Sequence, residues 1–153
     1  AWDTLLWFAI LISMSAELNA QGVMPYFSDV VSGALAAAKM SWAGAFALLH
    51  LGYYLMHYFF ASQSAHVGAL YPAFLSMMIA SGAPPALAAL TLAFNTNLFG
   101  GLTHFASGQS AVYFSSGELS LPTLWKQGAY MSVCNALIYG VVGMAWWKCI
   151  GLW

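Results

Sequence analysis

The sequence lacks charge over its central half. Positions 40–117 contain no Asp, Glu, Lys or Arg, and only 5% of the 153 residues are charged. A soluble domain carries charge on about a quarter of its residues, so this stretch cannot supply the surface of one. The chain also has no arginine and a net charge of −1, which excludes the basic patch that nucleic-acid binding requires.

Reactive groups are also scarce. If Cys134 and Cys149 share one helix, they lie about 22 Å apart, too far to form a disulfide within that helix. The sequence contains no metal-ligand spacing, no nucleophile–base pair and no paired carboxylates, so we expect no enzyme. The chain begins with Ala and shows no signal peptide, which fits a processed product or a piece of a longer chain.

What is present is apolar and aromatic, with 62% of the residues hydrophobic. Six of the seven tryptophans lie near the ends of apolar segments, as in the aromatic belts of membrane proteins: Trp2, Trp42, Trp125, Trp146, Trp147 and Trp153. We therefore predict an all-α integral membrane protein, with the lipid bilayer as its surroundings.

The apolar segments predict a single transmembrane unit over 1–153. Its predicted parts are a helix at 4–20, an interfacial or tilted piece at 26–38, hairpin arms at 41–60 and 65–80, a broken helix at 85–116 and a last helix at 124–148. Between the two arms, ASQS at 61–64 offers no charge, Gly or Pro for an exit into water, which predicts a re-entrant hairpin with its tip inside the membrane. The broken helix meets polar residues half-way across, and we expect its break near 104–109 and its second half from Ser110.

Two breaks inside a membrane present two half-helix N-termini, whose free N–H groups bind carboxylates without a cationic side chain. Ser62, Gln63 and Ser64 would lie at one N-terminus, and Ser107, Gly108 and Gln109 at the other. Unwound carbonyls could hold a cation. The alternative is that these serines only bond to backbone and pack between helices.

Other polar residues flank the breaks. We expect Asn95, Asn97 and Thr103 to line a substrate path or to pin the broken helix. His66 and His104 are candidates for a substrate or proton role, while His50 and His57 fit hydrogen bonds across the bundle.

Several segments resemble one family. They are WDTLLWFAILISM at 2–14, HYFFASQSAHVGALYPAF at 57–74, LAFNTNLFGGLTHFASGQSAVYFSSG at 92–117, and WKQG and WWKCIGLW near the end. They resemble the divalent-anion/sodium symporter family, in particular the 2-oxoglutarate/malate translocators of plastid inner envelopes and their bacterial relatives. The resemblance implies location in a plastid inner envelope, or alternatively in a bacterial inner membrane.

The resemblance also implies a fold and a site. Family members are homodimers of two inverted repeats that move like an elevator, and this chain matches the second repeat alone, so an N-terminal repeat or a partner chain is missing. Family tips are Ser-Asn-Thr, whereas this tip is Ser62-Gln63-Ser64. This departure argues against sodium coupling, for which the cation positions would be Ala61, Gln63 and Ala106, and it suits an exchanger. We expect no other cofactor.

The sequence thus predicts the C-terminal part of a dicarboxylate exchanger of the 2-oxoglutarate/malate type. The predicted substrate-binding residues are Ser62, Gln63, Ser64, Asn97, Thr103, Ser107 and Gly108. The alternative is a non-transporting structural subunit of a larger membrane complex derived from such a transporter. A third arrangement pairs two antiparallel copies to rebuild the inverted repeat.

Overall fold

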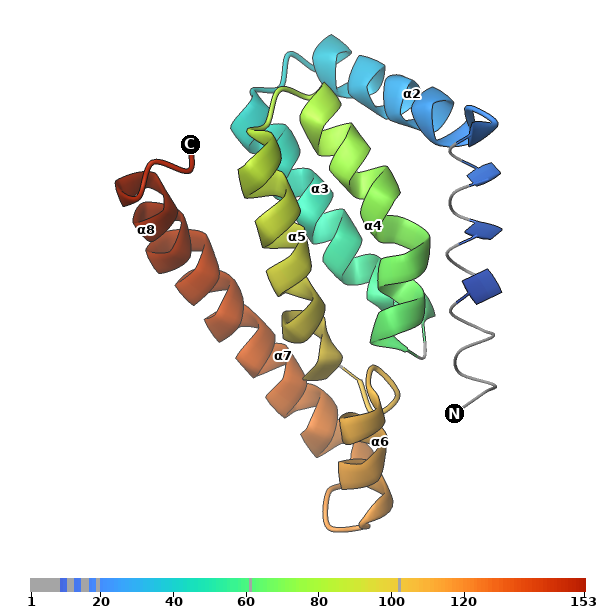
Figure 1. Cartoon of the computed structure of the whole chain (residues 1–153). Helices are drawn as coiled ribbons and strands as arrows, with labels where there is room; N and C mark the ends of the chain where they lie inside the picture. Colours follow the sequence, from blue (N-terminus) through green and yellow to red (C-terminus); the bar gives the residue numbers. More distant parts are fainter. Residues whose placement is uncertain (1–8, 11–12, 15–16, 19, 61, 102) are drawn as a thin grey trace.

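The computed structural model describes residues 9–10, 13–14, 17–18, 20–60, 62–101 and 103–153, and in these ranges it is helical and free of strands (Figure 1). Most of the expected helix at 4–20 lies outside the described residues, but those described in it up to residue 18 are helical.

Helix α2 (Val23–Ala37) lies across one end of the molecule and packs on α4 (Figure 1). It begins at Val23 rather than at the expected residue 26, directly after Gly22, whose φ of 77° is left-handed and favours glycine. Lys39 also takes a positive φ, 53°, where the chain turns toward the hairpin. This turn points the next helix away from α2.

The hairpin consists of α3 (Trp42–Met56), the 3-10 turn η1 (His57–Phe59) and α4 (Gln63–Ala80). Its two long helices lie side by side (Figure 1). Serine side chains cap both helices: Ser41 accepts the N–H of Gly44 at 3.3 Å, and Ser62 accepts the N–H of Ala65 at 3.5 Å. Each of the two helices thus begins where a serine hydroxyl can accept a backbone N–H of the first turn that has no carbonyl partner within the helix.

The next element is interrupted earlier than expected. Helix α5 (Pro85–Leu98) ends before the predicted break at 104–109, continues as the 3-10 turn η2 (Phe99–Gly101), and gives way to α6 (Gly108–Ser115). The helix gives way before residue 104, at Gly100 and Gly101, because glycines are poor helix formers. Serine hydroxyls downstream take the carbonyl of Gly100, so the chain gains partners by leaving the helix.

The last helix runs unbroken over 29 residues, Leu121–Cys149, and is the one helix in the described part of the chain that is long and apolar enough to cross a membrane. It comprises α7 (Leu121–Leu137), the π-helical stretch η3 (Ile138–Gly143) and α8 (Met144–Cys149). At 1.5 Å per residue its length is about 43 Å, enough for a bilayer with its headgroups.

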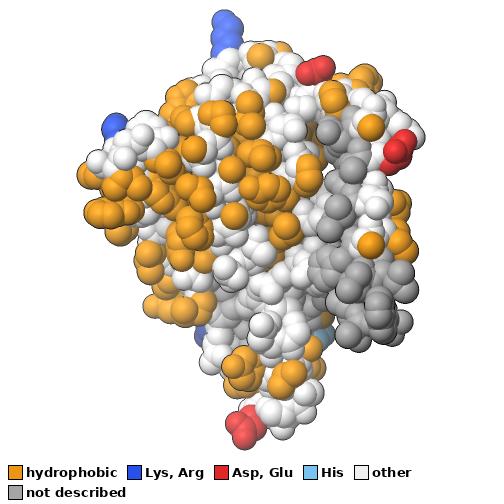
Figure 2. Space-filling view, viewed as in Figure 1, with side chains coloured by type: hydrophobic (Ala, Val, Ile, Leu, Met, Phe, Trp, Pro, Cys, Tyr) orange, Lys and Arg blue, Asp and Glu red, His pale blue; other side chains and the backbone are white. Residues whose placement is uncertain are grey.

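The core lies between α3, α4 and α5. Its least exposed large side chains are Tyr53, Met77, Met78, Leu87, Leu92 and Phe99. The outer face of α7 and η3 is apolar and exposed, as at Leu137 with 60% of its surface accessible. In the view of Figure 2 the apolar side chains gather over the left and upper centre of the molecule, and the charged ones lie toward the ends and edges. This distribution fits a protein whose apolar surface, including the outer face of α7 and η3, faces lipid.

Candidate functional site

Gln63 connects the hairpin tip to the end of α5. It is the first residue of α4, and its Nε2 donates to the carbonyl oxygen of Thr96 at 2.9 Å. The same amide lies directly against Gly100, where a Cβ would collide with it. Glycine at 100 therefore lets the two interrupted helices approach each other closely.

The start of α6 is fixed at the same glycine. Ser107 caps α6 by accepting the N–H of Ser110 at 3.2 Å, and its own hydroxyl donates to the carbonyl of Gly100 at 2.9 Å. The hydroxyl of Ser110 donates to this carbonyl too, at 2.7 Å. One carbonyl oxygen thus holds the first turn of α6 against the end of α5.

The N-termini of α4 and α6 are consequently joined through Gly100, with Gln63 on one side and Ser107 on the other. Both termini carry free N–H groups and the positive end of a helix dipole. No Asp, Glu, Lys or Arg occurs in the sequence between Lys39 and Glu118, the stretch that contains both termini. The arrangement offers a polar, uncharged region suited to anionic oxygens.

The remaining predicted residues divide by exposure. Ser62, Ser64, Gly108 and Asn97 are exposed, whereas Thr103 is 1% exposed and its Oγ1 has no hydrogen-bond partner. An orphaned buried hydroxyl is costly and marks a place for a further polar partner. Asn95, not Asn97, is the buried asparagine of α5.

The predicted cation positions are less open than the sequence indicated. The carbonyl of Ala106 already accepts a hydrogen bond from His57 Nε2 at 2.8 Å, and Gln63 is bonded to Thr96. Ala61, the third position, lies outside the described residues. Among the residues the structure describes, no cluster of three or more His, Cys, Asp or Glu side chains could hold a metal ion.

The histidines agree with the sequence interpretation only in part. His104 lies between η2 and α6; its Nδ1 accepts from Trp125 Nε1 at 3.5 Å, and its ring lies against Phe114. His50 does not bond across the bundle, because its Nδ1 pairs with the carbonyl of Phe46 one turn earlier, at 3.0 Å.

The hydrogen bond expected of His57 across the bundle is present, and it joins the first arm of the hairpin to Ala106 in the loop before α6. Sequence reasoning did not identify Ala106 as the partner. The only available signal was a histidine at the end of an apolar helix beside a polar tip. Its partner lies 49 residues away in the chain, so no local pattern could identify it.

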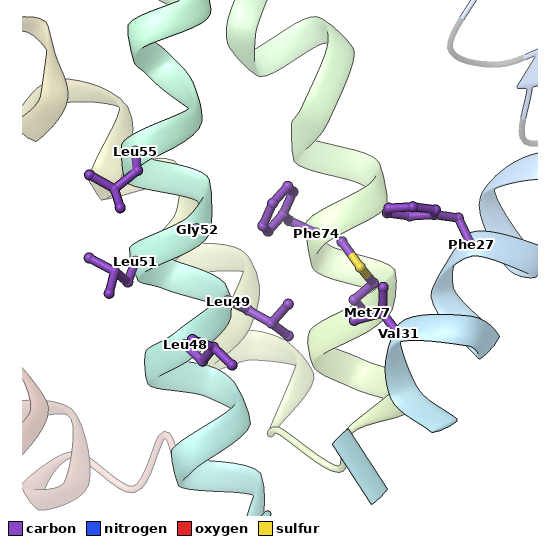
Figure 3. A pocket seen from close by; sticks show the side chains of 9 residues that line it. All are labelled: Phe27, Val31, Leu48, Leu49, Leu51, Gly52, Leu55, Phe74 and Met77. Carbon is purple, nitrogen blue, oxygen red and sulfur yellow. The ribbon is translucent and has the colours of Figure 1, made fainter. Parts of the chain in front are cut away.

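Two hollows lie between the helices. One, of about 340 Å³, is lined entirely by apolar residues of α2, α3 and α4, with Phe27 and Val31 facing Phe74 and Met77 (Figure 3). The other, of about 720 Å³, separates α3 and α5 from the last helix and is mostly apolar. None of the predicted substrate-binding residues lines either hollow, but Asn95, expected to line a substrate path or to pin the broken helix, lines the second one.

Comparison with known proteins identifies the class. The family model described as the sodium:sulfate symporter transmembrane region matches residues 1–153, so the chain belongs to this family. It is an integral membrane protein, of a plastid envelope or a bacterial inner membrane.

Particular relatives narrow the comparison. The chain is 54% identical over 153 residues to chloroplastic dicarboxylate transporter 2.1 of Arabidopsis thaliana, covering 100% of this chain and 27% of the relative. It is 52% identical to chloroplastic dicarboxylate transporter 2 of Spinacia oleracea, with the same coverage. An inner membrane protein of Escherichia coli is 30% identical over 99% of this chain and 32% of its own length. The chain thus spans between a quarter and a third of these relatives, and it matches the C-terminal part of the two plant proteins.

Proposed function

We propose that this chain is the C-terminal part of a transporter that exchanges dicarboxylates across a membrane. The observation that carries the proposal is the meeting of the α4 and α6 N-termini at Gly100 in an uncharged region. Two partly positive helix ends suit two carboxylates of one small molecule. The plant relatives are named as dicarboxylate transporters, which supports this substrate class.

The exposed polar groups at the two termini are proposed to contact substrate. Ser64 and Gly108 face outward beside the caps Ser62 and Ser107, and backbone N–H groups of both first turns complete the set. Thr103, with its unpartnered hydroxyl, is proposed to bond to substrate or to a water near it. Gln63 and Asn97 belong to the same region, the first as a tie to α5 and the second at its exposed end.

The finer mechanism is also a proposal. We infer that substrate is of the 2-oxoglutarate/malate type, that α3–α4 is a re-entrant hairpin, and that the unit moves as one repeat of an elevator. A preceding repeat would supply the facing half of the site, and the complete transporter would act as a homodimer. Since Gln63 and His57 occupy the Thr96 and Ala106 carbonyls, we propose exchange without sodium coupling.

The test is exchange in liposomes by the full-length transporter that contains this chain. Replacing Ser64 by Ala removes one bond to a charged carboxylate and should weaken exchange about tenfold. Ser76→Ala is the matched control, because its hydroxyl bonds only to Pro72 within α4, at 2.9 Å. Equal exchange by both variants would contradict the site.

The same assay separates the second candidate function. A non-transporting structural subunit would bring no dicarboxylate across the membrane, whatever its variants do. Exchange of labelled for unlabelled dicarboxylate by the unsubstituted protein excludes that alternative. Absence of exchange would favour it and overturn the proposal.

A further inference from the structure

The strongest unexplained feature is a pair of buried histidines beneath the hairpin tip. His57 is 1% exposed and His66 0% exposed, although both are polar and lie in the uncharged stretch of the chain. The rings of Tyr53, Phe60 and Phe99 surround His66, and Phe99 stacks on His57 with centroids 4.1 Å apart. Buried polar groups in such surroundings are retained only where their hydrogen bonds matter.

The hydrogen bonds fix the tautomers of the pair. A carbonyl oxygen only accepts, so His57 Nε2 carries the proton that it donates to Ala106 at 2.8 Å. In a neutral His57 the Nδ1 atom is then an acceptor, and His66 Nδ1, 3.4 Å away, is its donor. This leaves His66 Nε2 without a proton and, in the structure, without a partner. His66 therefore orients the ring that holds Ala106.

This chain of bonds ends at the candidate site. Ala106, itself 1% exposed, immediately precedes Ser107, the cap of α6. The first turn of α6 is held to α5 through Gly100 and to the hairpin through His57. Without the His57 bond, the loop before α6 would keep its tie to α5 but lose this tie to the hairpin that carries the other N-terminus.

We propose that His57 is a positioning residue that sets the distance between the N-termini of α4 and α6, and thereby the length of dicarboxylate that the site prefers. The inference rests on the proposed function, since it assigns one carboxylate to each terminus. His57 touches no substrate in this account. His66 acts through His57 by holding its tautomer and ring orientation.

The test compares succinate with glutarate, which differ by one methylene between their carboxylates, in liposomes containing the full-length transporter with this chain. His57→Phe keeps the ring stacked on Phe99 but removes the bond to Ala106. We expect the ratio of the two KM values to change about fivefold, as for the loss of one ordinary hydrogen bond, with a smaller change in maximal rate. His57→Gln, whose amide can replace Nε2–H as donor, should restore most of the parent ratio.

His50→Phe is the matched control, because His50 lies on α3, the helix that leads into η1, and bonds only to Phe46 one turn earlier. Should His57→Phe fail to fold, His66→Phe provides the second variant: it removes the donor to His57 Nδ1 and should shift the ratio less, in the same direction.

An unchanged ratio in the folded variants, equal shifts in His57→Phe and His57→Gln, or an equal shift in His50→Phe would overturn the inference. Those results leave dicarboxylate exchange intact, so the proposed function would stand. If the unsubstituted protein exchanges neither succinate nor glutarate, the proposed function fails first and the inference fails with it.

Discussion

At the scale of single residues, Gly100 is the position on which the candidate site depends most. Its carbonyl accepts from Ser107 and Ser110, and its Cα lies against the Gln63 amide. A neighbouring glycine, Gly101, has open space where its Cβ would be. The pair therefore offers a direct comparison of two substitutions that look identical in sequence.

Gly100→Ala should lower the free energy of unfolding by about 1–3 kcal/mol, because the new methyl group must displace the Gln63 side chain from Thr96. Gly101→Ala should be neutral or slightly stabilising, since Ala restricts the unfolded chain. Thermal unfolding in detergent measures both. Equal melting temperatures for the two variants would contradict the close approach at Gly100.

Residue types at the helix starts could be predicted from sequence, but their long-range partners could not. Ser62 and Ser107 precede helices because short hydroxyl side chains cap them, and this chemistry is local. The partner of Gln63 is 33 residues away and that of His57 is 49 away. Such pairs follow from how α5 folds back along the hairpin, which no spacing in the sequence encodes.

At the scale of elements, helix existence was more predictable than helix ends. Pro84-Pro85 and the long apolar run indicated α5, yet η2 and the early end at Leu98 depend on tertiary partners for the freed carbonyls. The last helix runs from Leu121 to Cys149, beyond the expected 124–148, because Pro122 fits its first turn and starts it early. Its central π-helical stretch carries no sequence signal.

The last helix is tied to the hairpin by a phenol. Tyr54 of α3 donates to Ser132 of α7, whose hydroxyl in turn donates to Gly128 at 2.7 Å. Tyr54→Phe should cost about 1 kcal/mol of stability and loosen α7. Tyr58 is an exposed tyrosine one turn later, and Tyr58→Phe should change the free energy of unfolding little. Melting curves in detergent measure the stability of both variants. An equal loss of stability in the two would show that the Tyr54–Ser132 bond contributes nothing.

At the scale of the whole molecule, the exposed apolar surface of the last helix determines where the chain can reside. Leu137, near the middle of the last helix, is 60% exposed, and Ile150, just past its end, is 55% exposed. Lysine at the bilayer centre costs about 2.5–3.5 kcal/mol on insertion scales, whereas lysine at a helix end can extend into the headgroups. Leu137→Lys should therefore reduce the membrane-integrated fraction, measured after alkaline extraction, while Ile150→Lys should not. Equal extraction of both variants would contradict the inference that the middle of the last helix faces lipid.

The central claim is that the α4 and α6 N-termini contact one dicarboxylate together. We would place single cysteines at Ser64 and at Gly108, and a control cysteine at Ser116, just past the far end of α6. The background is the full-length transporter with Cys134 and Cys149 replaced by Ser. The rate of thiol modification is then measured with and without succinate. The account predicts that succinate slows modification at positions 64 and 108 and leaves position 116 unchanged. Protection at only one of the two sites, or at neither, would contradict it.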